Sequence, residues 1–352
     1  HIEWTTLTSH EKILEITTKI AGANNYFNIL QYDGTTYLYS RCDCNEDLQY
    51  EDVGHCVCIR TSNDNFVSRK IFELDKYILA FYVFIDTNPN IDDSQRFKAV
   101  YGIRERFQSG NWWLATSPDG IAFRKIKIIW NREKTLRVIK GAYAFDALNT
   151  IYYNGTSKTY VAHARYVKSW KTSRTVMVSE TKDILNWPEK NWKVVNFNPN
   201  LKAGTSLYLF NAQPCPLPSC PYIVGFTTRF HNSLQNIDIN FAIGADKYKY
   251  YTSDVFNAYD RELGDYFPRN TWTVAGSLPD FERNEISYYI LHDNSFPHPF
   301  IRRYTLPFYR YSSLKCEETE CHIKMNKIST NKLKDIAINA KVLNMHGRIT
   351  FQ

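Results

Sequence analysis

Two short segments decide the fold: the strand-like run Phe97-Lys98-Ala99-Val100-Tyr101 and the polar turn Thr116-Ser117-Pro118-Asp119-Gly120-Ile121. The run is rich in the residues that favour strands, and the turn has Pro and Gly where a tight turn needs them. The run returns along the chain with an aromatic first residue, at steps of 60, 63, 62 and 66 residues: Tyr37, Phe97, Tyr160, Tyr222 and Tyr288. Comparable polar turns begin at Thr61, Thr116, Val178 and Ile243.

A repeat of about sixty residues with several short strands per unit is typical of β-propeller blades. Five units predict an all-β protein, with a five-bladed β-propeller over residues 1–314 and a short C-terminal β extension over residues 315–352. Within that extension, residues 336–342 and 348–351 are predicted to form strands outside the repeat. Helical signals are weak: residues 11–20 fit a short helix or a strand, and residues 182–187 fit one helical turn.

The composition narrows the classes of function. Aromatic residues make up 15% of the chain, which suits packed sheets and also the binding of apolar sugar faces. The net charge of +7 comes from scattered basic residues without a nucleic-acid motif, so it predicts a mild preference for acidic partners such as anionic glycans, and no nucleic-acid partner. No apolar run is long enough to predict membrane insertion.

Eight cysteines occur in close groups, which predicts disulfides and a secreted or extracellular protein. The expected pairs are Cys42–Cys58, Cys44–Cys56, Cys215–Cys220 and Cys316–Cys321. The alternative is a zinc site with four thiolates from the two Cys-x-Cys pairs, although that spacing is poorer for zinc than Cys-x-x-Cys. Asn154 begins the only glycosylation sequon, Asn154-Gly155-Thr156, which is also a plain hairpin turn.

A site is expected where the first strand of each blade lines the central channel, and polar residues at those places are candidates. They are Asn25, Asn28, Asp86, Asp146, Asn149, Asn211 and Glu285. Glycoside hydrolysis needs two carboxyl groups, one as acid and one as nucleophile or base, so Asp146, Asp86 and Glu285 are the catalytic candidates. The alternative for each Asp is a turn-capping role at a strand end. The asparagines are the candidate substrate-binding residues.

Other polar residues are interpreted as structural. Asp119, Asp183 and Asp246 recur once per blade in outer turns. The histidines lack metal-like spacing, and no phosphate-binding loop is present, so no metal and no cofactor are expected.

Several stretches resemble propeller proteins related to glycoside hydrolase families thirty-two and forty-three, many of them bacterial. They are Phe84-Ile85-Asp86-Thr87-Asn88-Pro89, Arg96-Phe97-Lys98-Ala99-Val100, Phe145-Asp146-Ala147-Leu148-Asn149, Tyr222-Ile223-Val224-Gly225-Phe226-Thr227-Thr228-Arg229-Phe230 and Glu285-Ile286-Ser287-Tyr288-Tyr289. The resemblance implies an axial pocket, with Arg229 among its substrate-binding residues, and often a following β-sandwich. Residues 335–351 would be the first strands of such a sandwich. Either this tail packs on the propeller, or the sandwich is truncated and the chain is part of a longer polypeptide.

The chain departs from family thirty-two, because the opening motif Trp-Met-Asn-Asp-Pro is absent and the first unit has Asn where an acid is expected. Three hypotheses therefore stay open. The first is a glycoside hydrolase-like enzyme that acts on a glycan or glycoconjugate through Asp146 with Asp86 or Glu285. The second is a glycan-binding or attachment module that lacks the acid pair. The third is a protein-interaction propeller with a narrow, apolar axis.

Overall fold

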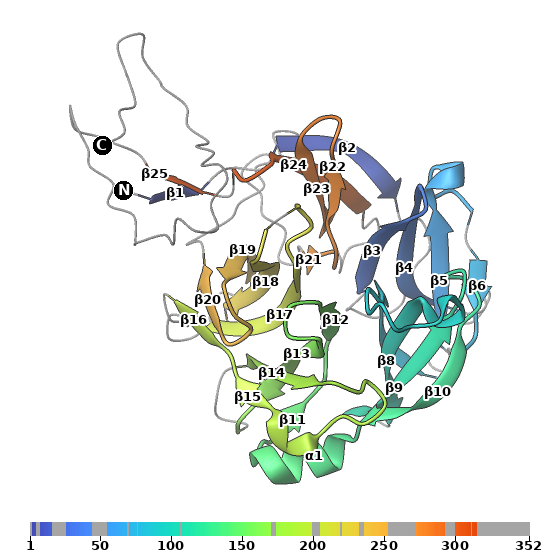
Figure 1. Cartoon of the computed structure of the whole chain (residues 1–352), viewed down its shortest axis with the longest axis vertical. Coiled ribbons are helices and arrows are strands. Elements are labelled where there is room, and N and C mark those ends of the chain that lie inside the picture. The colour runs from blue at the N-terminus through green and yellow to red at the C-terminus, as the bar shows by residue number, and fades with distance from the viewer. Residues whose placement is uncertain are drawn as a thin grey trace.

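A computed structural model of the chain is an all-β, five-bladed propeller, and Figure 1 views it with the five sheets arranged around a common axis. The structure describes residues 2–4, 8–15, 26–43, 55–68, 70–75, 77–105, 108–169, 174–198, 205–218, 220–231, 236–252, 272–292, 300–310 and 312–314. No helix in these ranges is both long enough and apolar enough to cross a membrane.

The first two blades are antiparallel sheets in which the strands follow one another from the axis outward. Blade 1 contains β3 (Phe27–Tyr32), β4 (Thr35–Asp43), β5 (His55–Thr61) and β6 (Lys70–Phe72). Blade 2 contains β7 (Ile78–Ile85), β8 (Phe97–Glu105), β9 (Gln108–Ser117) and β10 (Arg124–Trp130).

Blades 3 and 4 each have a fifth strand. Blade 3 contains β11 (Tyr143–Ala144), β12 (Thr150–Asn154), β13 (Thr159–Val167), β14 (Thr175–Thr181) and β15 (Lys193–Val194), with β11 and β12 both paired to β13. Blade 4 contains β17 (Thr205–Pro214), β18 (Ile223–His231), β19 (Asn236–Gly244), β20 (Lys249–Thr252) and β16 (Asn196–Asn198). Because β16 precedes the innermost strand β17 yet pairs in parallel with β20, the chain fills the outer edge of blade 4 before its centre.

The N-terminal segment closes the ring. Blade 5 contains β21 (Trp272–Thr273), β22 (Leu278–Asp280), β23 (Glu285–His292) and β24 (Phe300–Pro307), and its outermost strand is β2 (Thr8–Glu15). The sequence of residues 11–20 fits a short helix or a strand, and the structure has a strand as far as Glu15. Pairing the first strand with the last blade ties the two ends of the propeller together (Figure 1). A small sheet of β1 (Ile2–Trp4) and β25 (Ser312–Leu314) adds a second link.

The sixty-residue repeat corresponds to the blades. Its five aromatic markers lie in, or one residue before, the second strand of each blade. The polar turns join the third strand to the fourth, where Asp119 accepts hydrogen bonds from the amides of Ile121 and Ala122 and Asp246 accepts them from those of Tyr248 and Lys249. Asp183 makes the same kind of bond, so the structural interpretation of these acids is confirmed.

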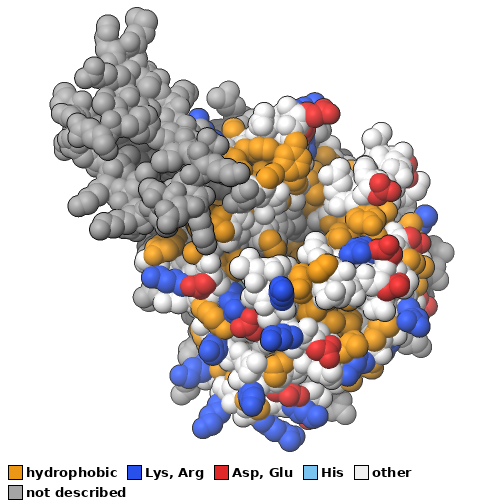
Figure 2. Space-filling view, in the orientation of Figure 1, with side chains coloured by type: hydrophobic (Ala, Val, Ile, Leu, Met, Phe, Trp, Pro, Cys, Tyr) orange, Lys and Arg blue, Asp and Glu red, His pale blue; other side chains and the backbone are white. Residues whose placement is uncertain are grey.

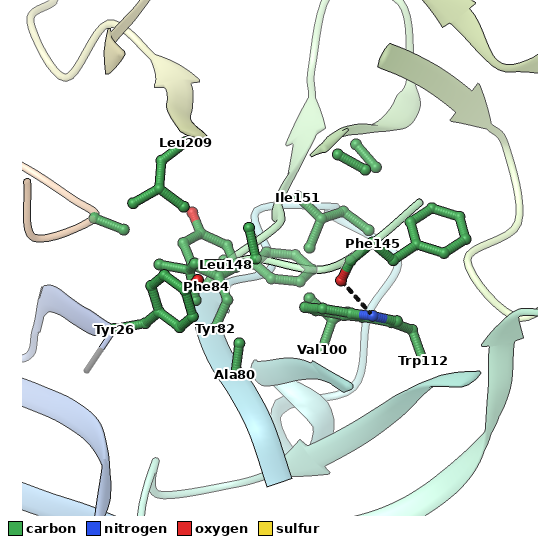
Figure 3. Packing of buried hydrophobic residues seen from close by; sticks show 14 of the residues in the cluster. Tyr26, Ala80, Tyr82, Phe84, Val100, Trp112, Phe145, Leu148, Ile151 and Leu209 are labelled. Atoms are coloured by element: carbon green, nitrogen blue, oxygen red, sulfur yellow. Dashed lines mark hydrogen bonds between the residues drawn. The ribbon is translucent and has the colours of Figure 1, made fainter. Parts of the chain in front are cut away.

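The core fills the centre of the ring. Tyr26, Tyr82, Leu148 and Leu209 come from the innermost segments of four blades, and Figure 3 shows them converging. All four side chains are buried. The innermost segments of blades 5 and 1 also touch directly, since the amide of Ile29 donates to the carbonyl of Ala275 at 2.7 Å. The axis is therefore apolar and packed along this part of its length.

The α-helix α1 (Arg132–Ile139) was not predicted from the sequence, because it lies between blades and carries no strong apolar periodicity. Its start has a local cause: the Asn131 side chain accepts a hydrogen bond from the amide of Lys134, which caps the helix.

The structure confirms the disulfides Cys42–Cys58 and Cys215–Cys220. Cys56 is disulfide-bonded as well, and the four-thiolate zinc alternative is therefore wrong. Cys44, Cys316, Cys321 and the predicted C-terminal strands lie outside the described residues.

Candidate functional site at one end of the axis

Asp146 lies in the segment between the short strand β11 and the innermost strand β12 of blade 3, and it forms an ion pair with Arg165 of the neighbouring strand β13. Its Oδ2 is 3.2 Å from Nη2 of Arg165, and Nη1 of the same guanidinium donates to the Asp146 carbonyl at 2.6 Å. The Arg165 side chain is only 6% exposed, whereas that of Asp146 is 31% exposed. The guanidinium thus holds a carboxylate that solvent can still reach.

Aromatic side chains from three other blades surround this pair. The Arg165 guanidinium lies 4.4 Å from the centre of the Tyr208 ring, a favourable cation–π geometry. Tyr208 packs edge-on against Trp272 with 4.8 Å between ring centres, and Trp272 packs against Tyr26 at 5.9 Å. Tyr26 and Trp272 are buried, and Tyr208 is half-buried.

Two further arginines bring positive charge to the same place. The guanidinium of Arg174 lies 5.3 Å from the Tyr208 ring centre. Burial lowers the pKa of Arg174, and the neighbouring charge of Arg165 lowers it further. Burial raises the pKa of Tyr26, while the charges of Arg165 and Arg41 act to lower it. We name this group the axial cluster; its members are Tyr26, Arg41, Asp146, Arg165, Arg174, Tyr208 and Trp272.

The axial cluster has more hydrogen-bond donors than acceptors. The Nε of Arg165 and the Nε1 of Trp272 are buried and have no acceptor among the described residues. Buried donors are nearly always paired in folded proteins, and because both atoms are enclosed, an ordered water is their expected partner.

Asp86 lies in a different environment, directly after the innermost strand β7 of blade 2. Its Oδ2 is 2.8 Å from Nζ of Lys98 and accepts a hydrogen bond from the Tyr160 hydroxyl at 2.8 Å. Its Oδ1 accepts from the amide of Asn88 at 2.9 Å. The side chains of Asp86 and Lys98 are 0% and 1% exposed. Burial lowers the pKa of Lys98, against the opposing effect of its bond to Asp86.

The two aspartates lie at opposite ends of the propeller. Asp146 precedes its innermost strand, Asp86 follows its own, and innermost strands run in the same direction around a propeller. Tyr160 binds Asp86 and Arg165 binds Asp146, so the distance between these two partners indicates how far apart the aspartates are. The partners are five residues apart on β13, which is roughly 16 Å at the rise of a strand. The paired carboxyl groups of glycosidases lie only about 5–10 Å apart.

Glu285 is the first residue of β23, directly opposite Asp280 across the β22–β23 hairpin. This hairpin follows the innermost strands of blade 5, so Glu285 lies at the same end as Asp86. The structure therefore brings neither of the other two predicted acids, Asp86 and Glu285, together with Asp146 across a pocket.

The predicted asparagines are buried and bonded chiefly to backbone. Asn28 donates to the carbonyl of Ala275 and accepts from the amide of Val83, which joins blade 1 to both of its neighbours. Asn149 donates to two carbonyls and accepts from the amide of Arg165, and this fixes the strand that carries the arginine. Asn211 donates to the carbonyl and hydroxyl of Thr273.

The remaining candidates have simpler positions. Arg229 is half-buried on β18, opposite Leu207. Asn154 ends β12. Its side chain accepts a hydrogen bond from the amide of Thr156 in an exposed turn. Asn25 lies outside the described residues. The described residues contain no group of three metal-ligating side chains.

A cleft of about 310 Å³ opens between blades 2 and 3 at the Asp86 end. Lys98 and Tyr160 line it, together with apolar side chains such as Leu114, Ile126 and Ile184. The Lys98 and Tyr160 heads, two of the polar groups that line this cleft, already bind Asp86.

Sequence reasoning missed the arginines and aromatic residues of the axial cluster. One signal was available for Arg165, because a charged residue in the otherwise apolar, fully buried strand β13 requires a partner. Arg174 gave no such signal, since its closeness to Tyr208 depends on a contact between blades. Arg41 lies on β4 beside the segment that carries Tyr26, so their closeness is a contact within blade 1.

Known structures share this fold at low sequence identity. No family model and no curated protein sequence matches the chain. A thermostable family-43 glycoside hydrolase is 12% identical with a TM-score of 0.55, over 88% of this chain and 99% of that one. The catalytic domain of a Coprinopsis cinerea family-62 α-L-arabinofuranosidase is 9% identical with a TM-score of 0.56, over 86% and 97%. A β-1,2-mannobiose phosphorylase from Listeria innocua is 9% identical with a TM-score of 0.58, over 86% and 97%.

These likenesses establish a glycoside hydrolase-like propeller fold. They support the resemblance to family forty-three and give no support to family thirty-two or to a bacterial source. At such low identity the fold alone is shared, and any role for the axial cluster has to be argued from its own geometry.

Proposed function

We propose that the protein is a secreted carbohydrate-binding propeller that holds a glycan against the axial cluster. The observation that carries the proposal is the partly exposed carboxylate of Asp146, fixed by Arg165 beside the rings of Tyr208 and Trp272. An aromatic ring can cover the apolar face of a sugar, while carboxylate and guanidinium groups exchange hydrogen bonds with its hydroxyls. A few fixed polar groups in an aromatic setting are typical of small-molecule sites.

Recognition accounts for the arrangement better than hydrolysis does. Glycoside cleavage uses two carboxyl groups on either side of the scissile bond. Asp146 is the only carboxylate of the axial cluster, and Asp86 and Glu285 lie at the other end. Burial makes Asp86 inaccessible to a sugar, since its side chain is 0% exposed.

Glycoside cleavage is the second candidate, favoured by the 31% exposure of Asp146 in a fold shared with glycoside hydrolases. In that case Asp146 would act as acid or base, and Asn at position 146 would abolish turnover. The two candidates differ in whether sugar is released after it binds.

Secretion is part of the proposal because the chain forms disulfides in two separate blades. Asn154 is proposed to be glycosylated, since its turn is exposed and lies far along β12 from Asp146. Expression in a secreting host, followed by mass spectrometry with and without removal of N-glycans, tests both points.

The experiment is a glycan-array screen of the purified chain, followed by calorimetry on the best ligand with Asp146→Asn and Tyr208→Ala. We expect each substitution to weaken binding at least tenfold, with no reducing sugar released by the wild-type chain. Arg137→Gln on the exposed face of α1 serves as the control. Release of sugar that stops in Asp146→Asn would establish the hydrolase instead. No binding by a folded wild-type chain, or binding that neither substitution weakens, would refute a site at the axial cluster.

A further inference from the structure

We propose that the axial cluster selects glycans that carry an anionic group, a carboxylate or a sulfate ester, and that Arg174 binds this group. The inference rests on the proposed function and names its substrate class. It is argued from the charge balance of the cluster, from the position of Arg174 and from the unpaired donors.

Positive charge exceeds negative charge within the cluster. Asp146 is its one carboxylate, and Oδ2 of that carboxylate is already paired with Arg165. The two guanidiniums of Arg165 and Arg174 lie within 4.4 and 5.3 Å of the same Tyr208 ring, so two like charges share one aromatic neighbour. Such an arrangement is stabilised by an anion placed between or beside the cations.

Arg174 is the member available to a ligand. It is half-buried, and its guanidinium forms no close ion pair with a carboxylate among the residues that the structure describes, although the charge of Asp146 acts on it from further away. Its backbone is fixed on both sides, because its carbonyl accepts from the amide of Leu207 and its amide donates to the Ser206 hydroxyl. A fixed, partly desolvated guanidinium presents a planar fork of donors that matches a carboxylate or a sulfate.

The unpaired donors point to the same chemistry. The Nε of Arg165 and the Nε1 of Trp272 are buried in side chains that are 6% and 4% exposed, and neither has an acceptor in the described part of the chain. Both atoms are enclosed, so they add to the positive potential at the cluster without contacting a ligand themselves, and this favours a ligand that carries negative charge.

A general basic surface does not account for the preference. On the face drawn in Figure 2, basic and acidic side chains are interspersed over the described surface. We therefore assign the preference to the cluster and expect its effect on binding to depend on Arg174.

The test uses three ligands built on galactose: tetragalacturonate, a sulfated galactotetraose without carboxylates, and neutral galactotetraose. Calorimetry of the wild-type chain should show at least one anionic ligand binding tenfold or more tightly than the neutral one. Arg174→Gln should weaken binding of the anionic ligand about 10- to 100-fold, since a charged hydrogen bond is lost. The affinity for the neutral ligand should stay unchanged. Arg174→Lys keeps the charge but not the planar fork of donors. Its affinity for the anionic ligand should lie between those of the wild-type chain and of Arg174→Gln. Arg137→Gln, on a side chain that is 79% exposed, removes the same charge and should have no effect.

The outcomes separate this inference from the proposed function. If the best ligands of the glycan array are neutral, or if Arg174→Gln weakens neutral and anionic ligands alike, the anion preference is wrong and the glycan-binding function stands. If a folded chain binds no glycan of either kind, the proposed function fails. Whichever anionic ligand binds more tightly identifies the source of the charge as carboxylate or sulfate.

Discussion

Asp86 and Asp146 each lie next to an innermost strand and each pair with a cation on a second strand, yet they differ in every respect that matters to a ligand. Asp86 is 0% exposed, and both of its oxygens are bonded to Lys98, Tyr160 or Asn88. Asp146 is 31% exposed, and its partner Arg165 retains an unpaired donor. The first network is closed within the protein, whereas the second is open to solvent.

This difference shows that an acid in a propeller cannot be assigned a role from its closeness to the axis alone. A closed network contributes to the stability of the contact between blades 2 and 3, because removal of any member leaves a buried polar group without its partner. An open network can complete its bonding only with a ligand or with water. Each prediction below either breaks one of the two networks or measures how far they differ.

The largest effect is expected at the closed end. Lys98→Met should lower the free energy of unfolding by about 3–5 kcal/mol, because Asp86 would be left as an uncompensated buried charge. Urea denaturation followed by tryptophan fluorescence measures the loss. Asp86→Asn combined with Lys98→Met should recover a large part of it, since the buried charge is then absent.

The matched substitution at the open end is Arg165→Met, which should cost about 1–2 kcal/mol, because water can reach the Asp146 carboxylate. Equal losses for the two single substitutions would contradict the distinction between closed and open networks.

Two buried histidines, His163 and His292, form further closed contacts, and we expect them to cause a loss of folding stability of intermediate size in acid. Burial lowers the pKa of His163 to about 3 and that of His292 to about 4, and their Nε2 atoms pair with the hydroxyls of Tyr250 and Tyr304 at 2.9 Å. Both imidazoles are neutral in the folded chain but take up a proton when it unfolds below about pH 6.5. The stability they contribute is complete above pH 6.5 and is lost as the pH falls toward 4 and then 3.

The expected loss is on the order of 2 kcal/mol per histidine between pH 7 and pH 4.5. Thermal unfolding monitored across this range measures it. Replacing both histidines by Asn should flatten the pH dependence of Tm, and an equally steep dependence in that variant would assign the acid sensitivity to other groups.

The smallest effect on stability is expected for Asp146→Asn, which should change the free energy of unfolding by less than about 1 kcal/mol, since the ion pair is partly solvated. The same substitution should nevertheless abolish or sharply weaken glycan binding. A variant with wild-type Tm and lost affinity would mark Asp146 as a residue kept for its ligand. A loss of several kcal/mol would place it with Asp86 among the structural acids.

The sequence was informative about the blades and much less so about the site, for a physical reason. Each blade is a local unit of about sixty residues, so aromatic runs such as Phe97-Lys98-Ala99-Val100-Tyr101 and turns around Asp119 report it directly. The order of Asp86 after its strand and Asp146 before its own already placed them at opposite ends. That the Arg174 side chain approaches Tyr208 depends on packing between blades, which no local pattern records.

The most direct test of the account is a crystal structure of the chain with its tightest-binding glycan, since two places compete for it. We predict that the sugar lies against Tyr208, with ligand atoms within hydrogen-bond distance of Arg174 and of the Asp146 carboxylate. A sugar found instead in the cleft between blades 2 and 3, beside Lys98 and Tyr160, would contradict the account, because it would place the binding site at the closed end of the propeller.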